Sequence, residues 1–207
     1  MEARGNTTLN IKLKWQRELD VNISDDEWLH IWKIQQSTTS SRVWRLHCWK
    51  NLIRFFITPK IRNKHTSLTQ PCWRSCGDIN VGHSHVFWLC PKIVKFWEDV
   101  HLVIGRVLGY DVPMSCTLLY LGILMGDVVL KDDRYIMKIM LVACKKAITR
   151  RWYKTDTPTQ EDWMKIMDEI HTMEQMTHKI RTQEDQCCRK WEKWTEYLKT
   201  TGQGLSQ

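Results

Sequence analysis

Three cysteines and one histidine lie within nineteen residues, with a spacing that is typical of a metal site. Cys72 and Cys76 form a Cys-x3-Cys pair, and His85 and Cys90 form a His-x4-Cys pair, in the run PCWRSCGDINVGHSHVFWLCP. Three thiolates and one imidazole match the tetrahedral ligand preference of a structural zinc ion. We therefore predict that these four residues bind zinc.

The identity of the histidine ligand stays open at the level of sequence. His83 lies two residues before His85, and spacing alone does not choose between them. The His85–Cys90 pair matches the second half of a zinc knuckle, whereas the first half is looser and the intervening loop is long. The alternative interpretation is two buried cysteines and a histidine placed there by chance.

Aromatic residues alternate with these ligands and with basic residues. Trp73, Phe87 and Trp88 could stack on unpaired bases if they are exposed, at about 1–3 kcal/mol per base. They could equally provide the apolar packing that a small metal module needs. We expect Trp73 to be the best candidate for a base contact.

The positive charge of the chain is concentrated around this cluster. Residues 33–97 hold eleven Lys and Arg and a single acid, Asp78, for a balance of +10, while the remaining 20 basic and 22 acidic residues give −2. This asymmetry indicates a polyanionic partner, although it could also be a solvated face. We predict that RNA or another single-stranded nucleic acid binds here. The contacts that we expect to phosphates are Lys50, Arg54, Lys60, Arg62, Lys64 and Arg74.

Composition favours a soluble, intracellular protein, in the cytoplasm or the nucleus. The apolar content of 43% suffices for a core, and the longest apolar run, 118–125, is far shorter than the roughly 20 residues that span a bilayer. No secretory signal pattern is visible, so we expect no membrane partner. In a reducing compartment, eight cysteines favour a metal site over a disulfide framework.

Helical periodicity and capping signals predict an all-α fold, irregular in arrangement, with a small zinc-knuckle-like insert. Ser24 and Glu27 form a capping box at a helix start. Gly109 is typical of a helix end. A second capping box is expected at Thr157, and residues 118–125 could form a short helix or a strand. The helices that we expect elsewhere cover 42–57, 93–107 and 132–152.

The C-terminal part carries a heptad-like seam of apolar residues from Trp163 to Leu198, with defects at Thr177 and Glu184. We expect one long amphipathic C-terminal helix. The alternative is two helices with a bend near 181–186. The segments that we distinguish are N-terminal helices in 1–71, the metal clip in 72–91, a helical core in 92–155, the C-terminal helix in 156–199 and a disordered tail in 200–207.

No catalytic constellation is visible, and we expect no enzymatic activity. A polymerase needs paired aspartates that hold Mg²⁺. Asp25 and Asp26 lie in the first turn of a capped helix, and Asp132 and Asp133 lie between two basic residues. There is no P-loop, dinucleotide fingerprint or nucleophile motif.

Several segments together resemble one family. The segments KLKWQRELD, WRLHCWKNLIRFFITPKIRNK, CWRSCGDINVGHSHVFWLCPKIVKFWEDV, KKAITRRW and TPTQEDWMKIMDEIHTMEQMTHKIR resemble the cysteine-rich C-terminal region of the second open-reading-frame protein of vertebrate LINE-type non-LTR retrotransposons. The resemblance covers roughly residues 13–198. It implies that Cys72, Cys76, His85 and Cys90 match the family's cysteine-histidine motif, although the loop before His85 is longer here.

In that family the region follows the endonuclease and reverse transcriptase domains and is thought to help the polymerase engage the element's RNA. This chain contains neither domain, so the resemblance implies a truncated or degenerate copy without reverse transcriptase activity. We therefore predict a non-catalytic RNA-binding module. The alternatives are a module that binds a protein partner or itself through the C-terminal helix, and a retroelement fragment with no selected function.

Overall fold

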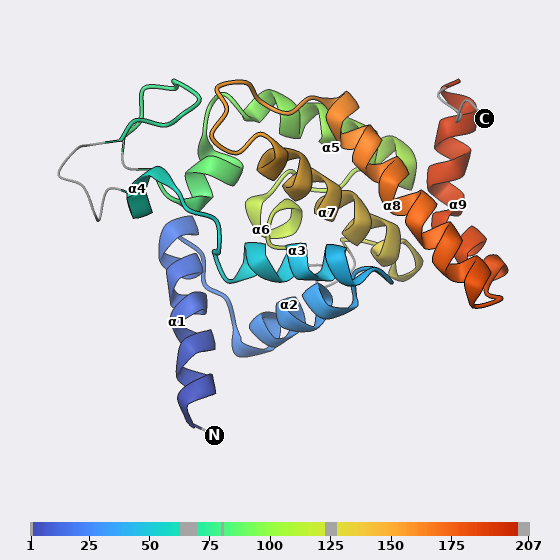
Figure 1. The fold of residues 1–207 in the computed structure, drawn as a ribbon, viewed down its shortest axis with the longest axis horizontal. Helices are drawn as coiled ribbons and strands as arrows, with labels where there is room; N and C mark the ends of the chain where they lie inside the picture. Colours follow the sequence, from blue (N-terminus) through green and yellow to red (C-terminus); the bar gives the residue numbers. More distant parts are fainter. Residues whose placement is uncertain (1, 63–69, 80, 123–127, 203–207) are drawn as a thin grey trace.

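All regular secondary structure in the described part of the chain is helical (Figure 1). The computed structural model describes residues 2–62, 70–79, 81–122 and 128–202. These residues contain no strand, only an isolated antiparallel bridge between Pro71 and Ile79. The prediction of an all-α fold is confirmed. The helices are α1 (Glu2–Leu19), α2 (Asp25–Ser37), α3 (Arg42–Leu52), α4 (Pro59–Arg62), η2 (His85–Leu89), α5 (Val94–Leu108), α6 (Cys116–Leu119), η3 (Lys131–Asp133), α7 (Arg134–Arg150), α8 (Gln160–Ile180) and α9 (Glu184–Thr200).

Helix α7 is the centre of the core. It contacts α3, α5, α8 and α9, and a helix with apolar residues on nearly every side is expected to be enclosed in this way. One hydrophobic core contains side chains from four of the five expected segments, such as Trp15, Cys72, Trp97 and Trp191. The metal clip is therefore continuous with the main core.

The C-terminal part is a hairpin of two helices, so the prediction of one long helix is wrong and the two-helix alternative is confirmed (Figure 1). Helix α8 ends at Ile180, Thr182 has a positive φ of 52°, and the Gln183 amide donates to the His178 carbonyl at 2.9 Å. The break falls between the two seam defects. Folding back lets α9 pack against α8, α7 and α5.

Two features of the N-terminal half differ from expectation. Helix α1 falls within the N-terminal helices expected in 1–71, although its bounds were not predicted; it is held by Trp15, whose Nε1 donates to the Leu52 carbonyl at 2.9 Å. Helix α3 ends at Leu52 rather than at residue 57, because Arg54 takes a positive φ of 61°. As a consequence, Phe55 leaves the buried face of α3 and is 57% exposed.

The capping signals were more accurate than the helix lengths. Ser24 and Glu27 form the expected capping box at α2, and Gly109 ends α5 with a φ of 83°. At α8 the box joins Thr159 and Asp162, two residues after the predicted start at Thr157.

Some expectations fall only partly on described residues. The apolar run at 118–125 begins in helix α6 and continues as a turn to residue 122, while 123–127 lie outside the described residues. The end of the expected disordered tail, 203–207, also lies outside them. None of the described helices is long and apolar enough to cross a bilayer.

Candidate metal centre

The four predicted ligands meet at one point in the structure. The ligand atoms of Cys72, Cys76, His85 and Cys90 all lie within 4.8 Å of one another. The Cys72 and Cys90 Sγ atoms are 4.0 Å apart, and Cys76 Sγ lies 3.4 Å from His85 Nε2. A tetrahedron with Zn–S bonds of about 2.3 Å has edges of about 3.8 Å. The group therefore has the donor set and the spacing that a tetrahedral metal ion requires.

A tight backbone turn brings the first two ligands together. The Cys72 amide donates to the Asp78 carbonyl at 2.8 Å, and the Ser75 amide donates to the Cys72 carbonyl at 2.9 Å. Ser75 and Gly77 both have positive φ values, of 53° and 98°. Glycine suits such a position because it has no Cβ to clash. This turn directs the sulfurs of Cys72 and Cys76 to the same side.

One π-helical turn positions the other two ligands. Within η2 the Cys90 amide donates to the His85 carbonyl at 2.9 Å, a hydrogen bond that spans five residues. Such single π-turns are frequent at functional sites. The His-x4-Cys spacing therefore has a direct structural reason, because one wide turn closes between the two ligands.

Two residues outside the ligand set act on the ligands. One orients the imidazole of His85, and the other places a positive charge near the thiols. Asp78 Oδ2 lies 3.5 Å from His85 Nδ1, which leaves Nε2 facing the sulfurs; a carboxylate behind a ligand histidine is the usual arrangement in metal sites. Arg74 is only 2% exposed, and its Nη1 donates to the Val86 carbonyl at 2.7 Å. Its buried charge faces a group of thiols. Asp78 was missed as a site residue, although it is the single acid of the basic region.

Burial and hydrogen bonds shift the pKa values of two of the ligand thiols in opposite directions. Burial favours the neutral Cys90 thiol, but hydrogen bonds from His85, the Lys92 backbone and Arg74 outweigh it and lower the pKa of Cys90 to about 6. Burial raises the pKa of Cys72 to about 12. Cys90 is therefore ready to bind a cation as thiolate at neutral pH, whereas Cys72 must release its proton when the metal binds.

His83 does not belong to the group. It is buried, its ring stacks on Phe87 with 6.5 Å between centroids, and its edge meets Trp15 at 6.3 Å. Burial, with the nearby charge of Arg54, lowers the pKa of His83 to about 3. His83 is thus a neutral core ring, and the structure places His85 with the three cysteines instead.

Two of the predicted phosphate contacts are buried or paired inside the protein. Arg74 is buried beside the cysteines, so its assignment to phosphate is wrong. Arg54 Nη1 pairs with Glu18 Oε2 at 2.6 Å, and its guanidinium lies 4.7 Å from the Trp15 ring centroid. Its role is to hold α1 against the end of α3, and its assignment to phosphate is corrected as well.

Among the other predicted contacts, those that the structure describes are accessible. Arg62 and Trp73 line the same pocket together with Tyr153, and Lys60 is exposed on the same short helix as Arg62. Lys50 is half-buried in a separate groove on α3. Lys64 lies outside the described residues.

The aromatic residues of the clip divide between packing and exposure. Phe87 is fully buried, and Trp88 packs against Trp97 with 4.9 Å between centroids. Trp73 is half-buried between Trp152 and Tyr153, at 5.0 Å and 5.1 Å. Packing is therefore the role of Phe87 and Trp88, whereas Trp73 keeps one side toward a pocket.

The chain matches no known protein-family model. The resemblance to the retrotransposon region therefore stays a prediction.

Proposed function

We propose that this protein is a zinc-stabilised module that binds single-stranded nucleic acid, RNA in particular. The Cys3His donor set favours zinc, because soft thiolates with one imidazole in tetrahedral arrangement suit that ion. The preference for RNA is supported by the retrotransposon resemblance alone. The observation that carries the proposal is the pocket shared by Arg62, Trp73 and Tyr153 beside the metal clip.

The pocket has the two kinds of group that single strands need. A guanidinium can pair with a phosphate through two hydrogen bonds, and aromatic rings stack on bases of any sequence. Arg62 supplies the first, and Trp73 and Tyr153 supply the second. Lys60 adds a further exposed charge on α4. This composition favours a phosphate-and-base ligand over a neutral one.

The metal clip is expected to set the shape of this pocket. Trp73 directly follows the ligand Cys72, and the turn that holds Cys72 begins at Pro71, which also lines the pocket. A bound zinc ion would fix four points of the chain around this turn. Loss of the metal should therefore weaken nucleic-acid binding without removing any contact directly.

A double variant tests the pocket. Lys60→Ala with Arg62→Ala should weaken binding of a fluorescently labelled single-stranded RNA at least about tenfold in an anisotropy titration. Each lost phosphate contact should also reduce the slope of log K against log salt by about 0.7. The matched control is Lys179→Ala with Lys199→Ala, which removes the same charge from α8 and α9. These helices lie at the opposite end of the molecule from α4 (Figure 1).

The two variants separate specific contacts from general charge. Equal losses in both would show that only net charge matters and would contradict the assignment of the pocket. A wild-type affinity that does not change between low and physiological salt, or no binding at all, would refute the proposed function.

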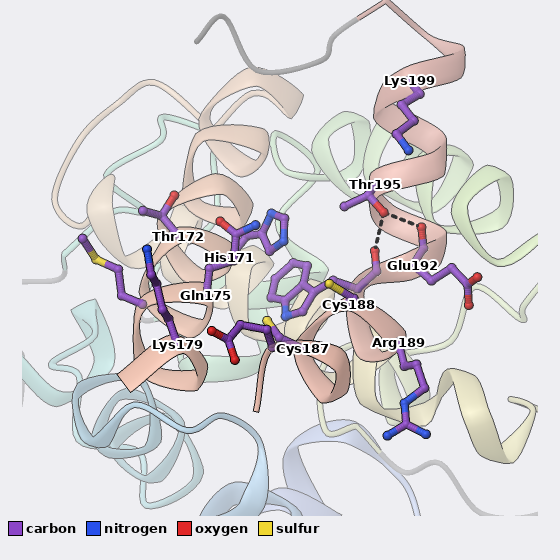
Figure 2. Close-up of a pocket in the computed structure, with 13 residues that line it drawn as sticks. His171, Thr172, Gln175, Lys179, Cys187, Cys188, Arg189, Glu192, Thr195 and Lys199 are labelled. Atoms are coloured by element: carbon purple, nitrogen blue, oxygen red, sulfur yellow. Dashed lines mark hydrogen bonds between the residues drawn. The ribbon is translucent and has the colours of Figure 1, made fainter. Parts of the chain in front are cut away.

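A second candidate function is self-association through the C-terminal hairpin. Met176 and Ile180 on α8 are 62% and 85% exposed. Met176 also lines a pocket of about 600 Å³ between α8 and α9 (Figure 2), and the lining includes the stacked rings of His171 and Trp191. Neighbouring exposed apolar residues at a pocket mark interaction surfaces more often than plain surface.

Sedimentation analysis distinguishes this second function. Under it, the wild-type protein dimerises with rising concentration, and Met176→Glu with Ile180→Glu makes it monomeric because two charges cannot be buried unpaired. Leu102→Glu, at an apolar residue of α5 that is 58% exposed, serves as the control and should change nothing. A wild-type protein that is monomeric at all concentrations would exclude self-association.

A further inference from the structure

A continuous chain of aromatic rings connects the Arg62–Trp73 pocket with a second basic surface. The rings are Phe55, Phe56, Trp152, Trp73 and Tyr153, and their successive centroid distances are 6.2, 5.2, 5.0 and 5.1 Å. We refer to them as the aromatic chain. Its interior members are half-buried, whereas Phe55 and Tyr153 at the two ends are 57% and 51% exposed. Large exposed rings at both ends of a packed row are available to a ligand.

Unusual backbone conformations present both end rings. Tyr153 has a positive φ of 63°, and Arg54, directly before Phe55, has a φ of 61°. Bulky residues rarely adopt this region, and its cost must be offset by surrounding contacts. For Arg54 the offset is the ion pair with Glu18. Because these backbone conformations hold two aromatic rings in solvent, each ring is a candidate contact for a ligand.

Basic residues lie beside both ends of the aromatic chain. Arg62 lines the pocket at the Tyr153 end, and several basic residues line a groove at the Phe55 end. Lys50, Lys146 and Arg150 line a groove of about 490 Å³ between the neighbouring helices α3 and α7, and Glu169 of α8 also lines it. Lys50 Nζ lies 4.9 Å from the Phe55 centroid. Arg150 pairs with Glu169 at 2.6 Å, but no carboxylate among the described residues pairs with Lys50 or Lys146. We call this surface the α3–α7 groove.

Burial, with a smaller effect of neighbouring positive charges, lowers the pKa values of two groups that line the groove. Burial and the charges of Arg150 and Lys50 lower the pKa of Lys146, against the opposing effect of Glu169. Burial lowers the pKa of His47 to about 3, assisted by Lys146, Lys145, Lys50 and Arg150. Like charges that repel in this way would be relieved by a bound anion.

We propose that the α3–α7 groove is a second contact site for the same single strand, with Lys50 and Lys146 on phosphates and Phe55 stacking on a base. This inference rests on the proposed function and extends it, because the aromatic chain links the two sites into one path. An acidic peptide could pair with the two lysines. It would not explain why exposed aromatic rings lie beside cations at both ends of the aromatic chain, so a nucleic acid is favoured.

Two variants of the groove test the proposal by anisotropy with a labelled single-stranded RNA. Phe55→Leu should lose about 5- to 150-fold in affinity, the value of one stacked base, while Phe55→Trp should keep the wild-type affinity. Lys50→Gln with Lys146→Gln should reduce the salt slope by about 1.4. Lys179→Gln with Lys199→Gln is the control for charge. Phe55 is exposed, so its variants should fold, and their circular dichroism melting curves should match the wild type.

The outcomes separate this inference from the proposed function. If the wild type binds and Lys60 and Arg62 matter, but the Phe55 and lysine variants bind as the wild type does, only the second site is refuted. If the wild type binds no single strand, both proposals fail. If instead a poly-glutamate peptide binds and depends on Lys50 and Lys146, the groove is a peptide site and the inference is overturned.

Discussion

Replacing Cys72 and Cys90 together by serine is expected to abolish metal binding and to destabilise the whole protein. Structural zinc contributes an apparent 10–16 kcal/mol or so in small zinc-finger peptides, and a serine hydroxyl is a poor ligand in its place. Both cysteines belong to the main hydrophobic core. We therefore expect about one zinc ion per wild-type chain, none in the variant, and a large fall in the urea midpoint. Metal content by mass spectrometry and tryptophan fluorescence measure the two effects.

Matched variants make this test specific to the site. Cys188→Ser changes an exposed cysteine on α9 and should keep the metal. His85→Asn should lose it, whereas His83→Phe should keep it, because the His83 ring is neutral and stacked in the core. Treating the wild type with a chelator should reproduce the cysteine variant. Equal zinc in the wild type and the double-serine variant would end the metal interpretation.

Replacing Glu174 by glutamine is expected to destabilise the protein despite the nearly identical shape of the two side chains. Glu174 is fully buried on α8, and each of its oxygens accepts two hydrogen bonds. Oε1 accepts from the Ser40 amide at 3.0 Å and the Ser40 hydroxyl at 3.3 Å. Oε2 accepts from the Tyr135 hydroxyl and from Trp191 Nε1 at 3.0 Å. One side chain thus joins α8 to the loop before α3, to α7 and to α9.

Glutamine cannot satisfy this set in either orientation. Its NH2 group would face the Ser40 amide in one orientation and Trp191 Nε1 in the other, and neither of these donors can turn into an acceptor. An unsatisfied buried donor costs about 1–3 kcal/mol. Glu174→Ala, which leaves every donor unpaired and opens a cavity, should cost about 3–5 kcal/mol.

Urea unfolding with the metal state held constant measures both Glu174 variants. The control is Glu169→Gln on the same helix, where the partly exposed pair with Arg150 should contribute less than about 1 kcal/mol. A Glu174→Gln variant as stable as the Glu169→Gln variant would show that the four hydrogen bonds do not hold the hairpin in place.

Local sequence signals predicted the ligand group well because its geometry is itself local. One backbone turn joins Cys72 and Cys76, and one π-turn joins His85 and Cys90, so spacing carried the information. The choice between His83 and His85 was not local. It depends on Trp15 of α1, which is far away in the chain and meets the edge of the His83 ring where that ring stacks on Phe87.

The helix ends also divide into those set by the local sequence and those set by distant packing partners. Ser24 and Gly109 marked boundaries correctly, since a cap is decided by the residue and its immediate neighbours. The early end of α3 and the break after Ile180 followed from packing partners elsewhere. Arg54 is held by Glu18 on α1, and α9 folds back because its buried tryptophans find the core formed by α5, α7 and α8.

By itself the sequence determined the all-helical class, the three cysteines and two candidate histidines of the metal site, and the concentration of positive charge in residues 33–97. Each of these depends on residue type and on spacings of a few positions. Only the tertiary structure decided which cations remain available to a ligand. It buried Arg74, paired Arg54, and brought Lys146 of α7 beside Lys50 of α3, far away in the chain. Burial and ion pairing depend on what packs across a side chain, and those neighbours are set by the fold rather than by the adjacent sequence.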